Sequence, residues 1–187
     1  MAGPPLRIRR AEPRDALAVA EIQVVTWRAA YAHILPAETL EALDVDRAAR
    51  FWLDRISTSG DTGARLVVAE PSGTVVGFSS FGPSRDDDLK GSSAVELYAL
   101  YVNPEFWGSG AGHALMSATL DHWSESGAGD ASLWVLERNV RARTFYERSG
   151  WVLDRRVQPV GDAAAGIEVR YRTDPVRRAN SAAVHGG

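Results

Sequence analysis

Three glycines stand at alternate positions, Gly108, Gly110 and Gly112, shortly after an apolar stretch that ends at Val102. A helix that begins at these glycines would offer unpaired N–H groups and a partial positive charge at its first turn. Glycine also allows a tight turn and lets a ligand approach the backbone closely. The pattern therefore favours a phosphate or pyrophosphate site that needs no lysine. The alternative is a strand-to-helix turn that needs glycine only for its backbone angles.

Two better-known glycine motifs do not fit this stretch. A dinucleotide fingerprint requires Gly-x-Gly-x-x-Gly, but His113 occupies the third glycine position. A Walker phosphate loop requires Gly-Lys-Ser or Gly-Lys-Thr, and neither occurs in the chain.

Glu96 is the carboxylate of an otherwise apolar segment, Ala94–Val102, that is expected to form a strand. It precedes Val102 by six residues, so both side chains lie on one face of a regular strand. A buried carboxylate is costly unless it is paired or functional. Glu96 could accept a proton from an amine, directly or through a water. Alternatively, it pairs with an arginine or binds a substrate ammonium without acting as a base.

Tyr146 belongs to a helical pattern that begins after Asn139 and ends at Gly150. Its spacing from Ala142 and Phe145 is by itself typical of a core residue. Asn139 is a good helix N-cap.

Periodicity and turn residues predict the elements that would position these side chains. We expect strands at 6–10, 65–70, 74–81, 94–102, 132–136, 151–157 and 167–172, with a hairpin turn at 71–73 and a turn at 161–166. Helices are expected after Pro13, over about 37–56 with a second cap at Asp46, after the glycines, and over 139–149. Inward-facing residues of the first two helical regions are expected to be Leu17, Ala20, Val24, Trp27, Tyr31, Leu40, Leu43, Ala49, Trp52, Leu53 and Ile56.

This mixture of elements favours a single α/β domain over 1–173, with a mixed sheet and helices on both faces, and a polar tail over 174–187. The chain has 187 residues and a net charge of −3, which does not indicate a nucleic-acid partner.

No cysteine is present, which excludes disulfides and a cysteine-linked acyl-enzyme. No long apolar run indicates a membrane span, so we expect a cytoplasmic protein. No His, Asp or Glu spacing indicates a metal site. The acidic run 86–88 is interpreted as a solvated loop or, alternatively, as an attractor of a cationic substrate.

Two blocks of the sequence resemble the GNAT superfamily of N-acetyltransferases, which use acetyl-coenzyme A. Residues 107–113, Trp-Gly-Ser-Gly-Ala-Gly-His, stand where that family has Gln/Arg-x-x-Gly-x-Gly/Ala at a helix start. Residues 139–151 match its Asn-x-x-Ala-x-x-Phe-Tyr-x-x-x-Gly-aromatic pattern. The resemblance covers roughly residues 6 to 173 and implies a mostly antiparallel sheet, flanked by helices, with a splayed strand pair. Trp107 departs from the pattern because Gln or Arg is usual there.

The resemblance also implies roles for individual residues. Glu96 would be the base, Tyr146 the acid that protonates the departing thiolate, and the backbone of Leu100, Tyr101 and Val102 a partner for the pantetheine arm. Coenzyme A would further contact Trp107, Gly108, Ser109, Gly110, Ala111, Gly112, His113, Asn139, Ala142 and Phe145. The acceptor would contact Trp27, Tyr31, His33 and Tyr98.

The expected activity is acetyl transfer to a primary amine by direct attack in a ternary complex. The acceptor could be a protein amine, a polyamine, an amino acid or an aminoglycoside-like amine, and the slightly acidic chain mildly favours a small cationic amine. The resemblance also suggests a homodimer. A non-catalytic acyl-CoA sensor on the same fold is the alternative.

Overall fold

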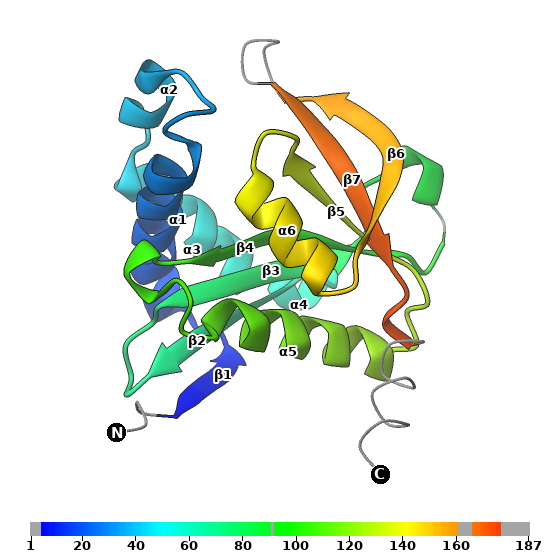
Figure 1. Cartoon of the computed structure of the whole chain (residues 1–187). Helices are drawn as coiled ribbons and strands as arrows, with labels where there is room; N and C mark the ends of the chain where they lie inside the picture. The colour runs from blue at the N-terminus through cyan, green and yellow to red at the C-terminus, as the bar shows by residue number, and fades with distance from the viewer. Residues whose placement is uncertain (1–4, 91, 161–165, 177–187) are drawn as a thin grey trace. The chain divides into compact units, whose positions relative to one another are not determined.

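A seven-stranded sheet with the strand order β1-β2-β3-β4-β5-β7-β6 is the central element of the fold (Figure 1). The computed structural model describes residues 5–90, 92–160 and 166–176. The strands are β1 (Leu6–Arg10), β2 (Arg65–Pro71), β3 (Gly77–Pro83), β4 (Val95–Val102), β5 (Ala131–Leu136), β6 (Val152–Pro159) and β7 (Ile167–Thr173). The pairs β1–β2, β5–β7 and β6–β7 are antiparallel, whereas β4 and β5 are parallel. The predicted mixed, mostly antiparallel sheet is confirmed.

Six α-helices accompany these strands in the described part of the chain. They are α1 (Ala16–Tyr31), α2 (Ala37–Glu41), α3 (Val45–Ser57), α4 (Ser59–Thr62), α5 (Ala111–Glu125) and α6 (Val140–Arg148). Short 3₁₀ turns cover Pro13–Asp15, Asp87–Leu89 and Pro104–Phe106. No described helix is both long enough and apolar enough to cross a bilayer.

The chain divides into two compact units that share elements rather than a linker. Unit 1 consists of Met1–Ser80 and Ala99–Met116, and unit 2 consists of Phe81–Tyr98 and Ser117–Gly187. The chain passes from one unit to the other inside β3, inside β4 and inside α5. The expectation of a single domain over 1–173 stays a prediction.

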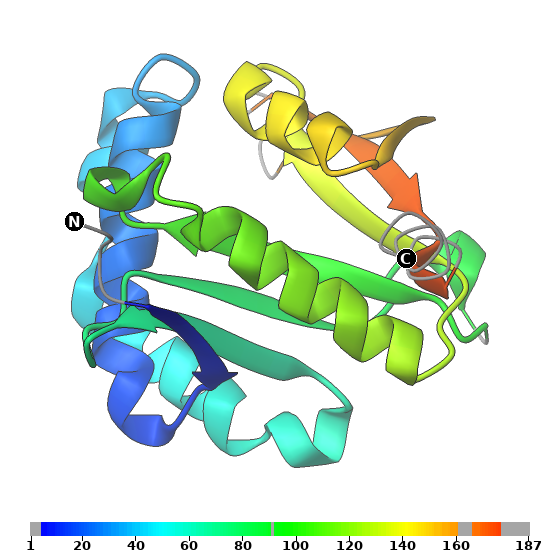
Figure 2. The ribbon, with the colours of Figure 1, turned by 60° about the horizontal axis from the view of Figure 1, so that its bottom comes forward.

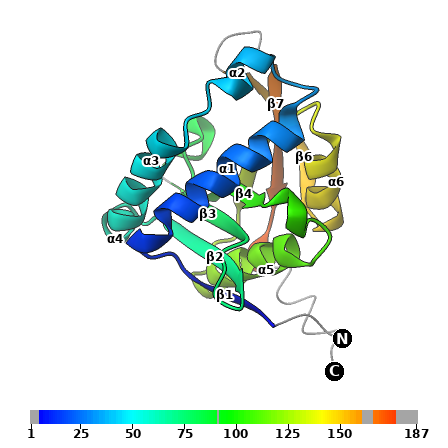
Figure 3. The ribbon, with the colours of Figure 1, turned by 90° about the vertical axis from the view of Figure 1, so that its left-hand side faces the viewer.

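Unit 1 has a core on each face of its strands, because alternate side chains of a strand point to opposite faces. On one face, Val19 of α1 and Trp52 of α3 pack with Phe78 of β3 (Figure 3). On the other face, the start of α5 packs through Ala111 and Leu115 against β2 and β4 (Figure 2). These two cores fix the end of β4 and the start of α5, which the glycine segment joins.

Aromatic side chains form the centre of unit 2. Phe81 contacts Trp123, which contacts Trp151, and the ring centroids are 5.5 Å and 6.4 Å apart. Tyr146 then contacts both Trp151 and Tyr171, at 6.4 Å and 6.5 Å. The Tyr146–Tyr171 pair is tilted and the other three pairs are edge-to-face. Aromatic pairs of this kind bury large apolar areas and fix ring orientation. The packing therefore positions α6, which carries Tyr146.

Three local predictions need correction. Asp44, not Asp46, caps α3, since its carboxylate accepts a hydrogen bond from the Arg47 N–H at 2.6 Å. Leu17 and Leu53 were expected inside, but they are 52% and 43% exposed. Apolar residues occur around much of α1. The predicted Ala20 and Val24 are buried, but Val19 and Ile22 are buried as well and were not in the predicted set.

The hairpin turn between β2 and β3 is confirmed. Ser72 and Gly73 have φ angles of 52° and 83°, and Thr74 N–H donates to the Pro71 carbonyl at 3.1 Å. The strand that follows begins at Gly77 rather than at Thr74. Residues 177–187 of the predicted tail and 161–165 of the predicted turn lie outside the described residues.

Candidate active site

The glycine segment connects β4 to α5 through two left-handed residues in unit 1. Gly108 and Gly110 have φ angles of 81° and 92°, which a residue with a Cβ rarely adopts. A Cβ built on either glycine would meet no heavy atom within 4 Å outside its chain neighbours, and both residues are exposed. The backbone angles, rather than internal crowding, therefore require these two glycines. Ala111 then begins α5.

Gly112 is different, because it lies inside the first turn of α5 with an ordinary helical backbone. Glycine inside a helix is less favourable than alanine by about 0.8–1.0 kcal/mol. The turn geometry does not account for Gly112, and the missing side chain leaves the first-turn N–H groups more accessible to a ligand. His113 follows on α5 and is exposed.

Trp107 binds the end of β4 instead of offering a polar side chain to solvent. Its indole Nε1–H donates to the Val102 carbonyl at 2.8 Å. The Thr26 hydroxyl of α1 donates to the same carbonyl at 3.1 Å. The Asn103 N–H donates to the Val76 carbonyl at 2.8 Å. Two side chains, from α1 and from the segment before α5, therefore hold the carbonyl of the last β4 residue, and Val76 holds the residue that follows it. Thr26 is a member of this set that the sequence did not indicate.

The ladder between β4 and β5 is short. It pairs Val95 with Ala131, Glu96 with Ser132 and Leu97 with Leu133. From there β5 continues to pair with β7 as far as Leu136, which lies opposite Glu168. Leu100, Tyr101 and Val102 are therefore not among the β4 residues in the described β4–β5 ladder.

Glu96 is buried and paired with Arg85, a residue of the β3–β4 loop in unit 2. The Glu96 side chain is 2% exposed, whereas that of Arg85 is 64% exposed. Arg85 Nη2 lies 2.5 Å from Glu96 Oε1, and the Arg85 backbone N–H donates to Oε2 at 2.8 Å. The hydrogen bond to Glu96 raises the pKa of the Arg85 guanidinium. Glu96 thus pairs with an arginine, which was the alternative expected from the sequence, and its role as a base stays a prediction.

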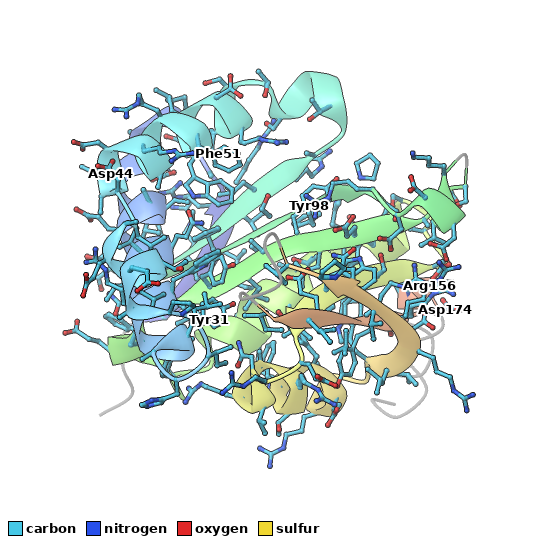
Figure 4. All side chains as sticks on the ribbon, turned by 90° about the horizontal axis from the view of Figure 1, so that it is seen from above. Tyr31, Asp44, Phe51, Tyr98, Arg156 and Asp174 are labelled. Carbon is cyan, nitrogen blue, oxygen red and sulfur yellow. The ribbon has the colours of Figure 1, made fainter. Side chains whose placement is uncertain are left out.

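Both oxygens of Glu96 already accept hydrogen bonds from Arg85, since Nε also lies 3.2 Å and 3.1 Å from them. A substrate proton could reach Glu96 directly only if a donor of Arg85 moved, or indirectly through a water. The ring of Tyr98 lies under the guanidinium, 4.3 Å from Cζ to the centroid. Figure 4 labels Tyr98 on β4.

The acidic run 86–88 is not a solvated loop, and that prediction is wrong for Asp86 and Asp88. Arg170 of β7 is 1% exposed and donates to Asp86 and Asp88 at 2.9–3.0 Å. Its Nε also donates to Asp154 at 2.8 Å. Asp86 further accepts from the Trp134 indole at 2.7 Å. A buried charge is costly unless it is paired, so the network is compensated internally and fixes the loop that carries Arg85.

The α6 residues named by the sequence lie at the start and on the inner side of that helix. The Asn139 carbonyl Oδ1 accepts from the Ala142 N–H at 3.1 Å, which confirms the predicted N-cap. Phe145 packs on Tyr146 at 5.5 Å, and Tyr146 is buried among the aromatic rings of unit 2. The core interpretation of Tyr146 is thus realised, and its role as an acid stays a prediction.

The predicted acceptor residues of unit 1 lie at the end of α1 and just beyond it. Trp27 and Tyr31 form an edge-to-face pair at 5.3 Å. The Trp27 indole N–H is buried and has no hydrogen-bond partner among the described residues. His33 follows α1 and is exposed. Figure 4 labels Tyr31 at the end of this helix.

No group of His, Asp and Glu among the described residues has the geometry to hold a metal ion. The residues that sequence reasoning missed are Thr26, Arg85 and Arg170. Arg85 lies in a loop, and Arg170 pairs with carboxylates far away in the sequence. Hydrophobic periodicity predicts neither kind of contact.

Comparison with known proteins supplies the family. Residues 20–151 match the model of the Acetyltransferase (GNAT) family. The uncharacterized N-acetyltransferase YuaI of Bacillus subtilis is 33% identical over 132 residues, which cover 71% of this chain and 72% of YuaI. Among solved structures, the PaiA N-acetyltransferase of Thermoplasma acidophilum in complex with coenzyme A has a TM-score of 0.74 at 19% identity, covering 91% of this chain and 99% of PaiA. YncA of Salmonella typhimurium with acetyl-CoA has a TM-score of 0.66 at 22% identity, covering 91% and 94%.

The family match covers well over half of the chain and includes both blocks that carry the resemblance, the glycine segment and the Asn139–Trp151 block. The TM-score of 0.74 shows that the chain shares its fold with the PaiA structure. This chain belongs to the GNAT family and is an acetyltransferase.

Proposed function

We propose that the chain transfers the acetyl group of acetyl-CoA to a primary amine by direct attack within a ternary complex. The observation that carries the proposal is the glycine segment at the start of α5, in a chain of the GNAT family. Gly108 and Gly110 turn the backbone, and Gly112 is a third glycine that the turn does not require. Structures of PaiA and YncA contain coenzyme A and acetyl-CoA, respectively. The pyrophosphate of coenzyme A fits the donors of a helix start.

The pantetheine arm carries amides, which can pair with a strand as an added strand would. We assign this pairing to Leu100, Tyr101 and Val102, because the described β4–β5 ladder ends before them. A backbone N–H near Val102 would donate to the thioester oxygen and stabilise the tetrahedral intermediate.

In the reaction, the amine nitrogen attacks the thioester carbon, and the carbon–sulfur bond breaks. An alkylammonium has a pKa of about 10.4, so it must lose a proton before it attacks. We assign the removal of that proton to Glu96, through a water, since Arg85 occupies both carboxylate oxygens. As the carbon–sulfur bond breaks, the thiolate takes a proton from the Tyr146 hydroxyl. The nitrogen, which carries one proton too many after its attack, loses that proton to the Tyr146 oxygen, so the amide forms and the hydroxyl is restored. No covalent enzyme intermediate is required, and the chain has no cysteine to form one.

One observation favours the second candidate, a non-catalytic acyl-CoA sensor. A Glu96 that is buried and paired with Arg85 is also what a purely structural carboxylate would look like. The sensor binds acetyl-CoA without turning it over.

The test is a panel of amines assayed by release of the coenzyme A thiol, with Glu96→Gln as the variant. Loss of the base should lower kcat by about 10²-fold or more. Affinity for coenzyme A, measured by calorimetry, should change little. Glu125→Gln, an exposed residue at the end of α5, is the matched control.

The outcomes separate the candidates. Turnover that is unchanged in Glu96→Gln contradicts the base assignment. Binding of acetyl-CoA without turnover of any amine supports the sensor.

A further inference from the structure

Arg85 is an exposed cation that its surroundings hold in one orientation. One edge of the guanidinium, Nε with Nη2, faces Glu96. One face of the group stacks on Tyr98, and the Tyr98 hydroxyl donates to the Pro83 carbonyl at 2.6 Å. The Arg85 backbone N–H is also fixed on Glu96. An exposed arginine normally loses side-chain entropy when it binds a ligand. Here most of that entropy is already lost in the folded protein, because Glu96 and Tyr98 fix the side chain.

The second edge of the Arg85 guanidinium makes no described contact. A guanidinium offers two forks of parallel N–H donors, and the fork made by Nη1 and Nη2 matches a carboxylate. The hydrogen bonds and ion pairs of Arg85 involve Nε, Nη2 and the backbone N–H, all directed to Glu96. A planar anion could therefore bind Arg85 without displacing Glu96.

The carboxylates next to Arg85 in the chain do not compete for that edge, because each has a cation of its own. Asp86 pairs with Arg170, and Asp87 pairs with Lys90. Asp88 pairs with both Arg170 and Arg156. Among the described residues of the β3–β4 loop, these carboxylates therefore form ion pairs with other cations and not with the Nη1–Nη2 edge of Arg85.

We propose that Arg85 selects acceptors that carry a carboxylate close to the reacting amine, an inference that rests on the proposed function. The Arg85–Glu96 pair is the charge complement of a zwitterion. The carboxylate of the acceptor binds the Nη1–Nη2 edge of Arg85, and the ammonium lies on the side of Glu96 and gives up its proton through a water. A purely cationic amine meets the same charge at Arg85 and gains no partner there, which favours an amino-acid-like acceptor over a polyamine.

The experiment compares matched pairs that differ only in the carboxylate: phenylalanine with phenethylamine, tyrosine with tyramine, and lysine with cadaverine. We expect the wild-type enzyme to show a kcat/KM at least tenfold higher for the carboxylate member of the best pair. Arg85→Lys keeps a cation beside Glu96 but has no fork, and Arg85→Gln removes the charge. Both should reduce the ratio within that pair by about tenfold.

Arg156→Gln is the matched control, because Arg156 is also an exposed arginine of unit 2, 57% exposed and paired with a carboxylate (labelled in Figure 4). It should leave the ratio unchanged. The inference is overturned if the wild-type enzyme prefers the decarboxylated amines. It is also overturned if the preference for the carboxylate member survives both Arg85 substitutions. Either result leaves the proposed function standing.

A binding measurement separates failure of the inference from failure of the proposed function. With coenzyme A present, calorimetry compares N-acetylphenylalanine with N-acetylphenethylamine on the wild type and on Arg85→Lys. If no amine turns over but the acid binds in an Arg85-dependent way, the proposed function fails and only the carboxylate-binding role of Arg85 is supported. If no amine turns over and the two compounds bind equally or not at all, both are overturned.

Discussion

At the scale of residues, the Val102 carbonyl accounts for Trp107, the residue that departs from the family pattern. Trp107 stands where Gln or Arg is usual, and its indole N–H binds the Val102 carbonyl that Thr26 also binds. Val102 is buried, so an unpaired carbonyl at this place would be costly. Trp107 is therefore a positioning residue for the end of β4.

Replacing Trp107 by Phe should lower the free energy of unfolding by about 0.5–1.5 kcal/mol, because Thr26 still satisfies the carbonyl. The double variant with Thr26→Val leaves the carbonyl without a side-chain donor, so its loss should exceed the sum of the two single losses. Urea unfolding of the four proteins measures this coupling. If the losses of stability in the two single variants simply add in the double variant, the two side chains are not coupled through the Val102 carbonyl.

At the scale of elements, the approach of β3 to β4 depends on a residue without a side chain. A Cβ on Gly77 would lie 2.9 Å from the Tyr101 carbonyl oxygen and 3.1 Å from Val102 Cγ2. The backbone of β4 cannot move away freely, since its end is held by the contacts of Val102 described above. Close packing at Gly77 is therefore a condition for the position of Leu100–Val102.

Gly77→Ala should destabilise unit 1 by about 1–3 kcal/mol through overpacking and should raise the KM for acetyl-CoA. Gly60→Ala is the matched control, because a Cβ there meets nothing within 4 Å and alanine suits a helix better. Urea midpoints and KM values test both variants. Equal midpoints for the two would show that β4 adapts to the added methyl group.

The elements also show what the sequence could and could not predict. The Asn139 cap and the hairpin turn at Pro71–Gly73 were predicted because they depend on neighbours within three residues. The pairing of Asp86 with Arg170 was missed because the partners are 84 residues apart and meet across the sheet. A run of aspartates has the same composition whether it is solvated or paired. The ion pairs that fix the loop carrying Arg85 could therefore be found only from the three-dimensional structure.

At the scale of the whole molecule, each unit contains a charge network that responds to acid. Asp15 of unit 1 binds Arg9 at 2.6 Å and 2.9 Å, and Asp88 of unit 2 binds Arg170. The hydrogen bonds to Arg9 and to Arg170 lower the pKa of Asp15 and of Asp88, respectively. In the native state these carboxylates therefore hold their negative charge to a lower pH than in the unfolded chain.

Stability from Asp15 and Asp88 should be fully present above the unfolded pKa of about 3.9 and should be lost as the pH falls through their lowered native pKa values. Asp15→Asn and Asp88→Asn should each lower stability at pH 7 and flatten its decline between about pH 5 and pH 2. Urea unfolding across this range measures the slope, with exposed Asp54→Asn as control. A slope unchanged in both variants would contradict the assignment.

The way the chain alternates between the two units sets an order of events during synthesis. Unit 1 contains the first 80 residues but lacks Ala99–Met116 until the ribosome has made the loop with Arg85 and the first half of β4. Ala69 and Val76 belong to the core that Val102, Ala111 and Leu115 complete. A nascent chain that ends before these residues therefore leaves this apolar sheet face uncovered. Unlike the core that contains Val19, Trp52 and Phe78, whose buried residues all lie within the first 80 residues, this core cannot close until the glycine segment and the start of α5 have been made.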